Sequence, residues 1–224
     1  SNLIKSCKEI KRQTSLNKIW DKKFIENYEA YNKDRQQLQI LERKLQLRQH
    51  KMCRQLLHIF PFREINIISN DNNKLKTSKF EIRYMSIPNN FDKLMNVVNQ
   101  GGIEEEKMAI GLGYIAHLCT LLSRYLQVPL RHPIICRGSR SKIVGVFEEA
   151  EEYQAIRENR RTKIKPEYPL YSKNEDKQRF KYGLELLKGN ISQLALYVNI
   201  HHYKSNSFIH NIRNVLYTMA LARF

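Results

Sequence analysis

The first 60 residues contain neither proline nor glycine, and this absence constrains the fold more than any other feature. A spacing of 3.5 residues runs through the segment, and ten of its seventeen seam positions are apolar. Such a sustained repeat predicts a long coiled-coil helix over residues 1–60, which would reach about 85–90 Å at 1.5 Å per residue. The apolar positions of the expected interface are Leu3, Ile10, Trp20, Phe24, Tyr31, Leu38, Leu41, Leu45, Met52 and Ile59.

Polar residues interrupt this seam and limit the choice of partner. Asp34 and Arg48 occupy two of the interrupted positions. In a homodimer each would oppose a like charge, whereas a complementary residue on a different chain would fix partner and register. The seam therefore favours a heterodimer. The alternative is a single solvated helix that packs on its own domain.

Residues 61–224 show a loose alternation of strand and helix patterns, which predicts an α+β domain. Pro61 ends the first helix, and the two strands that follow are joined by a turn-rich stretch at 70–73. Later helices are expected to bury apolar faces, and His117 and Cys119 are assigned to the core. The expected strands are 65–68, 80–88 and 130–136; the expected helices are 89–98, 104–127, 176–196 and 208–224, with a charged helix or loop at 146–165.

Charge points to anionic partners, because 39 Lys and Arg against 22 Asp and Glu give a net charge of +17. A basic coiled-coil protein that binds nucleic acid is therefore an alternative function, although the sequence carries no zinc finger, RNP-like aromatic motif or base-reading basic helix. The longest uncharged run, 108–123, is shorter than the ~20 residues of a spanning helix. Because the chain opens with Ser1, we expect it to be a piece of a longer protein.

Candidate chemistry is sparse. The pattern Gly111-Leu-Gly-Tyr-Ile-Ala116 has the spacing of a dinucleotide fingerprint, but its flanks are helical rather than strand and turn. Close helix packing explains the small residues better. The histidines and cysteines lack metal-ligand spacing, so no cofactor, metal or catalytic residue is expected. The best anion or membrane contact is a turn that contains Arg137, Arg140 and Lys142, whose alternative is an ordinary surface turn.

Several uncommon strings occur in order and resemble the UV-radiation-resistance-associated protein family. They are Gly111 to Ile135, Gly138-Ser-Arg-Ser141, Tyr168-Pro-Leu-Tyr171 and Arg179 to Leu194. A long preceding coiled coil fits the same family, so the resemblance covers roughly residues 1–195. The stretch 146–165 and the tail from His201 do not match. A related family, the autophagy-specific Barkor-like subunits, shares the coiled-coil plan and stays an alternative.

The resemblance implies a non-catalytic scaffold subunit of the endosomal class III phosphatidylinositol 3-kinase complex. It implies a coiled coil at 1–60 that pairs with a Beclin-like protein, and a domain at 61–224 like Beclin's C-terminal (BARA) domain. Further partners implied are the kinase catalytic subunit, its pseudokinase regulatory subunit and an anionic membrane. The implied location is cytoplasmic, peripheral on endosomes and autophagic membranes, with roles in autophagy and endosomal traffic.

Overall fold

The computed structural model describes residues 2–67, 77–88, 91–145, 166–200 and 207–221. The sequence-based assignments for the turn at 70–73, the charged stretch 146–165 and most of the polar break after His201 lie outside these residues. The contacts of the chain divide it into two compact units, Ser1–Arg48 and Gln49–Phe224.

Helix α1 (Asn2–Ile59) forms the first unit and continues into the second. It ends just before Pro61, which cannot donate the next helical hydrogen bond. Its last turns belong to the second unit because Cys53 and Leu56, with Phe60 after them, are buried there. The compact units therefore meet at 48/49, inside the helix, whereas the predicted division at 60/61 follows the helix end.

A three-stranded antiparallel sheet follows α1, with the order β1-β2-β3. Its strands are β1 (Phe62–Ile67), β2 (Thr77–Ile82) and β3 (Met85–Pro88). The prediction of one strand over 80–88 is wrong, because Ile82 pairs with Met85 across a two-residue turn. Residues paired across a two-residue turn share a face, so the buried positions shift from Phe80 and Ile82 to Ile87, and the alternation predicted through Tyr84 does not continue.

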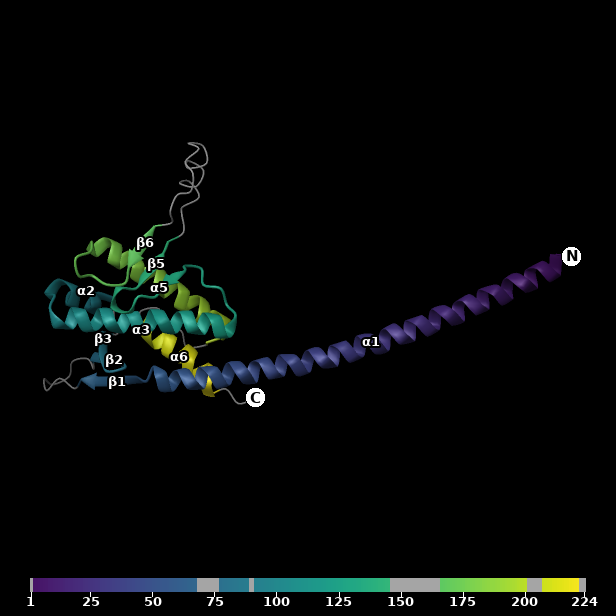
Figure 1. Ribbon diagram of the computed structural model, residues 1–224, viewed down its shortest axis with the longest axis horizontal. Helices are drawn as coiled ribbons and strands as arrows, with labels where there is room; N and C mark the ends of the chain where they lie inside the picture. Colours follow the sequence, from purple (N-terminus) through teal and green to yellow (C-terminus); the bar gives the residue numbers. More distant parts are fainter. Residues whose placement is uncertain (1, 68–76, 89–90, 146–165, 201–206, 222–224) are drawn as a thin grey trace, which may run out of the picture. The chain divides into compact units, whose positions relative to one another are not determined.

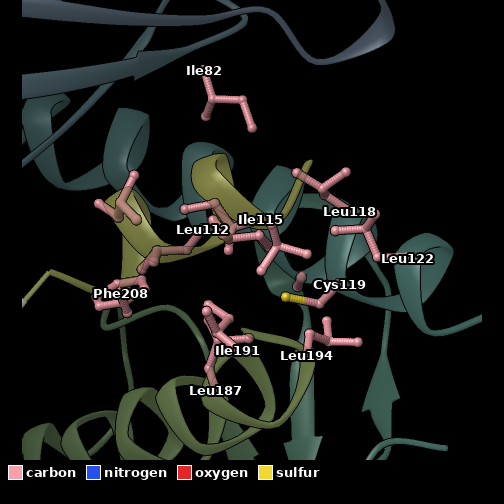
Figure 2. Packing of buried hydrophobic residues seen from close by; sticks show 14 of the residues in the cluster. Ile82, Leu112, Ile115, Leu118, Cys119, Leu122, Leu187, Ile191, Leu194 and Phe208 are labelled. Carbon is pink, nitrogen blue, oxygen red and sulfur yellow. The ribbon is translucent and has the colours of Figure 1, made fainter. Parts of the chain in front are cut away.

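Helix α3 (Ile103–Leu126) is the centre of the second unit. It contacts β2 and β3 of the first sheet, and also α5 (Lys177–Tyr197) and α6 (Phe208–Leu221). In the view of Figure 1 the first sheet lies below α3 and α5 lies above it, and α5 and α6 also pack against each other. Helix α2 (Phe91–Gln100) packs beside β3 and α3. In Figure 2, Leu112, Ile115 and Leu122 of α3 share one cluster with residues of α5 and with Phe208. The predicted α+β class is confirmed.

A second antiparallel sheet has the order β4-β5-β6. Its strands are β4 (Ile134–Ile135), β5 (Lys142–Val144) and β6 (Glu167–Pro169), with a short 3-10 turn, η1 (Gly138–Arg140), between the first two. The expected strand over 130–136 is thus reduced to two residues.

Side-chain amides of α5 explain this short strand. Asn190 is fully buried; its Oδ1 accepts from the His132 N–H at 3.0 Å, and its Nδ2 donates to the His132 carbonyl at 2.7 Å. Gln193 does the same for the Arg131 N–H and the Pro129 carbonyl, at 3.0 and 2.7 Å. The backbone before β4 is therefore satisfied by two side chains one helical turn apart and needs no strand partner.

Candidate partner-binding surfaces

The predicted coiled-coil residues of the first unit are exposed along α1. Between 42 and 72% of the surface is exposed to solvent in each of Ile10, Trp20, Phe24, Tyr31, Leu38, Leu41 and Leu45. Leu3 lies in the helix, but its side chain is outside the described part of the chain. A row of large exposed apolar side chains along one helix is typical of a binding face.

The sequence reading missed part of this apolar surface. Leu16 and Tyr28, which flank the seam, are 44 and 59% exposed, and the Tyr28 ring stacks on Phe24 with centroids 6.5 Å apart. Ile40 and Leu47 lie further round the helix and are 54 and 49% exposed. Counting the flanking heptad positions as well as the seam would have found the wider face.

At the end of α1 the seam and the core-facing stripe are different faces. Cys53 and Leu56 are buried in the second unit, whereas Met52 is half-buried and Ile59 is 49% exposed. The seam residues Met52 and Ile59 therefore stay partly exposed, although each is next in sequence to a residue buried in the core of the second unit.

The candidate anion contact lies on and beside η1. Arg137 and Arg140 flank the turn and are exposed, and no carboxylate among the described residues lies within ion-pair distance of either. Lys142 on β5 instead pairs with Glu167 at 3.2 Å, so its charge is partly neutralised. Ser141 is buried and fixes the turn, since its Oγ accepts from the Arg137 N–H and donates to the Gly138 carbonyl. The structure therefore leaves two arginines, rather than three cations, available to an anion.

A cavity of about 230 Å³ lies beside this turn and carries both signs of charge. Arg140 and Lys173 line it together with Glu105 and Glu106. Lys173 pairs with Glu106 at 2.6 Å and lowers the pKa of that carboxyl through the hydrogen bond and its charge. Ser172 donates a hydrogen bond to Glu105. The acidic wall opposes an anion inside the cavity, so an anion would approach Arg137 and Arg140 from solvent.

The glycine pattern of α3 serves packing. Gly111 and Gly113 lie buried inside the helix, not in a turn after a strand. A Cβ at Gly113 would lie 2.1 Å from the Gly138 carbonyl oxygen. The interpretation as close packing is confirmed, and the dinucleotide-binding alternative is wrong because no phosphate-binding turn exists there.

Histidine and cysteine on α3 do not form a reactive pair. Cys119 is fully buried, as predicted, and burial raises the pKa of its thiol well above the usual range. The assignment of His117 to the core is wrong, because its side chain is exposed. Its ring lies nearly perpendicular to that of Phe60, with centroids 5.8 Å apart. The two side chains thus occupy different environments, two residues apart on one helix.

We expect the cysteines to differ in reactivity. Burial raises the pKa of the Cys53 thiol to about 11, and Cys119 is likewise fully buried, whereas Cys136 is exposed. Brief alkylation with iodoacetamide at pH 8 should therefore modify Cys136 at least about tenfold faster than Cys53 or Cys119, because the thiolate is the nucleophile. Peptide mass spectrometry with and without guanidinium measures this, and equal rates for all three in the folded chain would contradict it.

The described residues hold neither a membrane-spanning helix nor a metal-binding cluster. No helix there is long and apolar enough to cross a membrane. No group of three or more His, Cys, Asp or Glu in the same part of the chain is placed to hold a metal ion.

Curated proteins that this chain partly matches include the following three. The UV radiation resistance-associated protein of Mus musculus is 40% identical over 102 residues, covering 46% of this chain and 13% of that protein. The vacuolar protein sorting-associated protein 38 of Schizosaccharomyces pombe is 26% identical over 138 residues, covering 62% and 25%. The UV radiation resistance-associated gene protein of Drosophila melanogaster is 33% identical over 89 residues, covering 39% and 11%. The matches span a quarter or less of each relative's length.

The family described as "Vacuolar sorting 38 and autophagy-related subunit 14" matches residues 2–223. This match includes α1 and every described element of the second unit. Together with the mouse and Drosophila relatives it agrees with the resemblance drawn from the ordered strings at 111–194. The chain therefore belongs to the Vacuolar sorting 38 and autophagy-related subunit 14 family, and within it to the UV radiation resistance-associated type.

Proposed function

We propose that this chain is a non-catalytic scaffold of an endosomal class III phosphatidylinositol 3-kinase complex, acting in autophagy and endosomal traffic. Its α1 seam pairs with the coiled coil of a Beclin-like protein, and its second unit is a BARA-like domain. The kinase catalytic subunit and its pseudokinase partner join through this heterodimer. The family description, which names vacuolar sorting and an autophagy-related subunit, supports this assignment.

The uncovered α1 seam is the observation that carries the proposal. Seven apolar seam residues between Ile10 and Leu45 are 42–72% exposed, and burying them against a partner helix would remove a large apolar area from water. Asp34 and Arg48 lie in the same seam and would meet their own copies in a parallel, in-register homodimer. An unlike helix can offer each of them an opposite charge, so the heterodimer is favoured.

The outer face of η1 supplies the membrane contact of this scaffold. Arg137 and Arg140 are exposed and unneutralised among the described residues, and an arginine near an anionic leaflet gains about 1 kcal/mol. Lys142 contributes less because Glu167 lies 3.2 Å from its Nζ. The second unit would thus sit on endosomal or autophagic membranes as a peripheral protein. The endosomal type is preferred over the Barkor-like type on the 40% identity to the mouse relative.

Native mass spectrometry of the chain co-expressed with a Beclin-like coiled coil tests the pairing. We expect a 1:1 heterodimer at concentrations where each chain alone is a monomer or a weak self-dimer. A chain that stays monomeric beside that partner would contradict the proposal. A self-dimer as stable as the mixed one would do the same, because the polar seam would then not select its partner.

A further inference from the structure

The hairpin between β2 and β3 carries two residues that its backbone disfavours. Arg83 and Tyr84 form the whole turn, and their φ angles are +48° and +66°. Positive φ at both central positions is the mark of a type I′ turn, for which Asn-Gly is the preferred sequence. Neither arginine nor tyrosine adopts this region readily. Their presence needs a reason other than the local backbone.

The side chains of this turn form a cluster of cations and aromatic rings. The Arg63 guanidinium lies 5.4 Å from the Tyr84 ring centroid, and that of Arg83 lies 5.2 Å from the Tyr114 centroid. Tyr84 keeps 74% of its surface exposed. The Tyr114 ring in turn packs edge-on against Phe60, with centroids 6.3 Å apart. We call Arg63, Arg83, Tyr84 and Tyr114 the arginine–tyrosine patch.

Both guanidiniums of the patch are held in place but not neutralised. Arg63 and Arg83 are exposed, and no carboxylate among the described residues lies within ion-pair distance of either. Glu81 is the cross-strand neighbour of Arg63, yet the guanidinium stacks on Tyr84 instead. An arginine side chain that is already held against a ring loses little further conformational entropy when a carboxylate binds it. Its guanidinium can hold that carboxylate through two parallel hydrogen bonds.

The patch continues the seam of α1 within the second unit. Ile59 is the last apolar seam position and is 49% exposed, and Pro61, two residues later, accepts a hydrogen bond from the Arg83 N–H at 3.3 Å. Met52, one heptad before Ile59, is half-buried. The backbone of the patch is thus bonded to the chain two residues beyond the last apolar seam position. Tyrosine and arginine are the residue types most common at the energetic centre of protein interfaces.

We propose that the arginine–tyrosine patch binds an acidic segment of the same chain that pairs with the α1 seam. Carboxylates of that segment pair with Arg63 and Arg83, and its apolar atoms cover Tyr84. This inference rests on the proposed heterodimer and adds a second contact, which fixes where the partner helix ends. The disfavoured turn is kept because Asn-Gly would remove the two side chains that the partner contacts.

The test measures the affinity of the full chain for the full-length Beclin-like partner. Arg63→Glu with Arg83→Glu should weaken binding at least about tenfold. The control, Lys93→Glu with Arg131→Glu, changes the net charge equally on exposed residues elsewhere in the second unit and should change affinity less than about twofold. A crosslinker, p-benzoylphenylalanine in place of Tyr84, should form an adduct with an acidic stretch of the partner.

A second variant separates binding from folding. Arg83→Asn with Tyr84→Gly gives the turn its preferred sequence, so the melting temperature should rise by roughly 2–4 °C while affinity falls. Unchanged affinity in both patch variants, with the wild-type pair intact, would overturn only the patch. If the crosslinker reacts only with anionic phosphatidylserine vesicles, or the patch variants weaken only binding to those vesicles, the patch is a membrane contact and not a partner contact. Failure of the wild-type chain to pair at all would overturn the heterodimer as well.

Discussion

The Gly113→Ala variant is expected to destabilise the second unit strongly. A Cβ at this position would lie 2.1 Å from the oxygen and 2.7 Å from the carbon of the Gly138 carbonyl. Backbone cannot rotate out of the way as the end of a side chain can, so α3 and η1 must separate. Overpacking that moves backbone costs about 1–3 kcal/mol and occasionally more, and we expect a loss at the upper end of this range in the free energy of unfolding, measured with urea and circular dichroism.

Two other helical glycines are matched controls for this variant. A Cβ at Gly189 on α5 would have no neighbour nearer than the His132 ring at 3.9 Å, so Gly189→Ala should stabilise by about 0.5–1 kcal/mol. A Cβ at Gly111 would meet the Ile87 side chain at 2.6 Å. The change in unfolding free energy of Gly111→Ala should therefore fall between those of Gly113→Ala and Gly189→Ala. Equal stability of Gly113→Ala and Gly189→Ala would show that the approach of η1 to α3 does not limit the fold.

The long helix was predictable from sequence because its signal is local and repeated. The absence of proline and glycine before Pro61 and the 3.5-residue spacing both act within a few turns, and α1 runs from Asn2 to Ile59 as expected. What the repeat does not encode is the second face. Cys53 and Leu56 differ from their seam neighbours because they join the buried core of the second unit, most of whose members lie far away in the sequence.

The second unit shows the same limit. Its later helices were placed within a few residues because each has an apolar stripe and clear end signals, such as the Asp176 cap of α5. The short strand β4 was overestimated because Asn190 and Gln193, about 60 residues later, supply the hydrogen bonds of the preceding backbone. The turn at Arg83 and Tyr84 gave no turn signal at all, since neither residue type is associated with positive φ.

The candidate contacts divide in the same way. The exposed seam residues could be named from the sequence, because the heptad spacing shows which residues share one face of the helix. Arg137, Arg140 and Lys142 looked equivalent, but Glu167 distinguishes Lys142 from the other two only after β5 and β6 have paired. The arginine–tyrosine patch required the fold, because residues 63, 83–84 and 114 come together only through the hairpin and α3.

The double variant Leu41→Asp with Leu45→Asp should abolish pairing through α1. Both residues are exposed in the single chain, at 61 and 42%, so the helix itself should keep its circular dichroism spectrum. In the heterodimer each aspartate would be buried in an apolar seam without a partner, which costs about 1–3 kcal/mol per group even for a polar side chain and more for a charge. We expect the dissociation constant for a Beclin-like coiled coil to rise more than about a hundredfold.

The matched control adds the same two charges outside the seam. Gln36→Asp with Gln39→Asp changes exposed positions of the same helix and should leave the dissociation constant within about threefold. Equal weakening by both variants would mean that added negative charge, rather than the seam, sets the affinity. Persistence of the heterodimer with Asp at 41 and 45 would place the interface on another face, and the exposed Ile40 and Leu47 would then define it, because they are the remaining apolar residues of that stretch outside the seam.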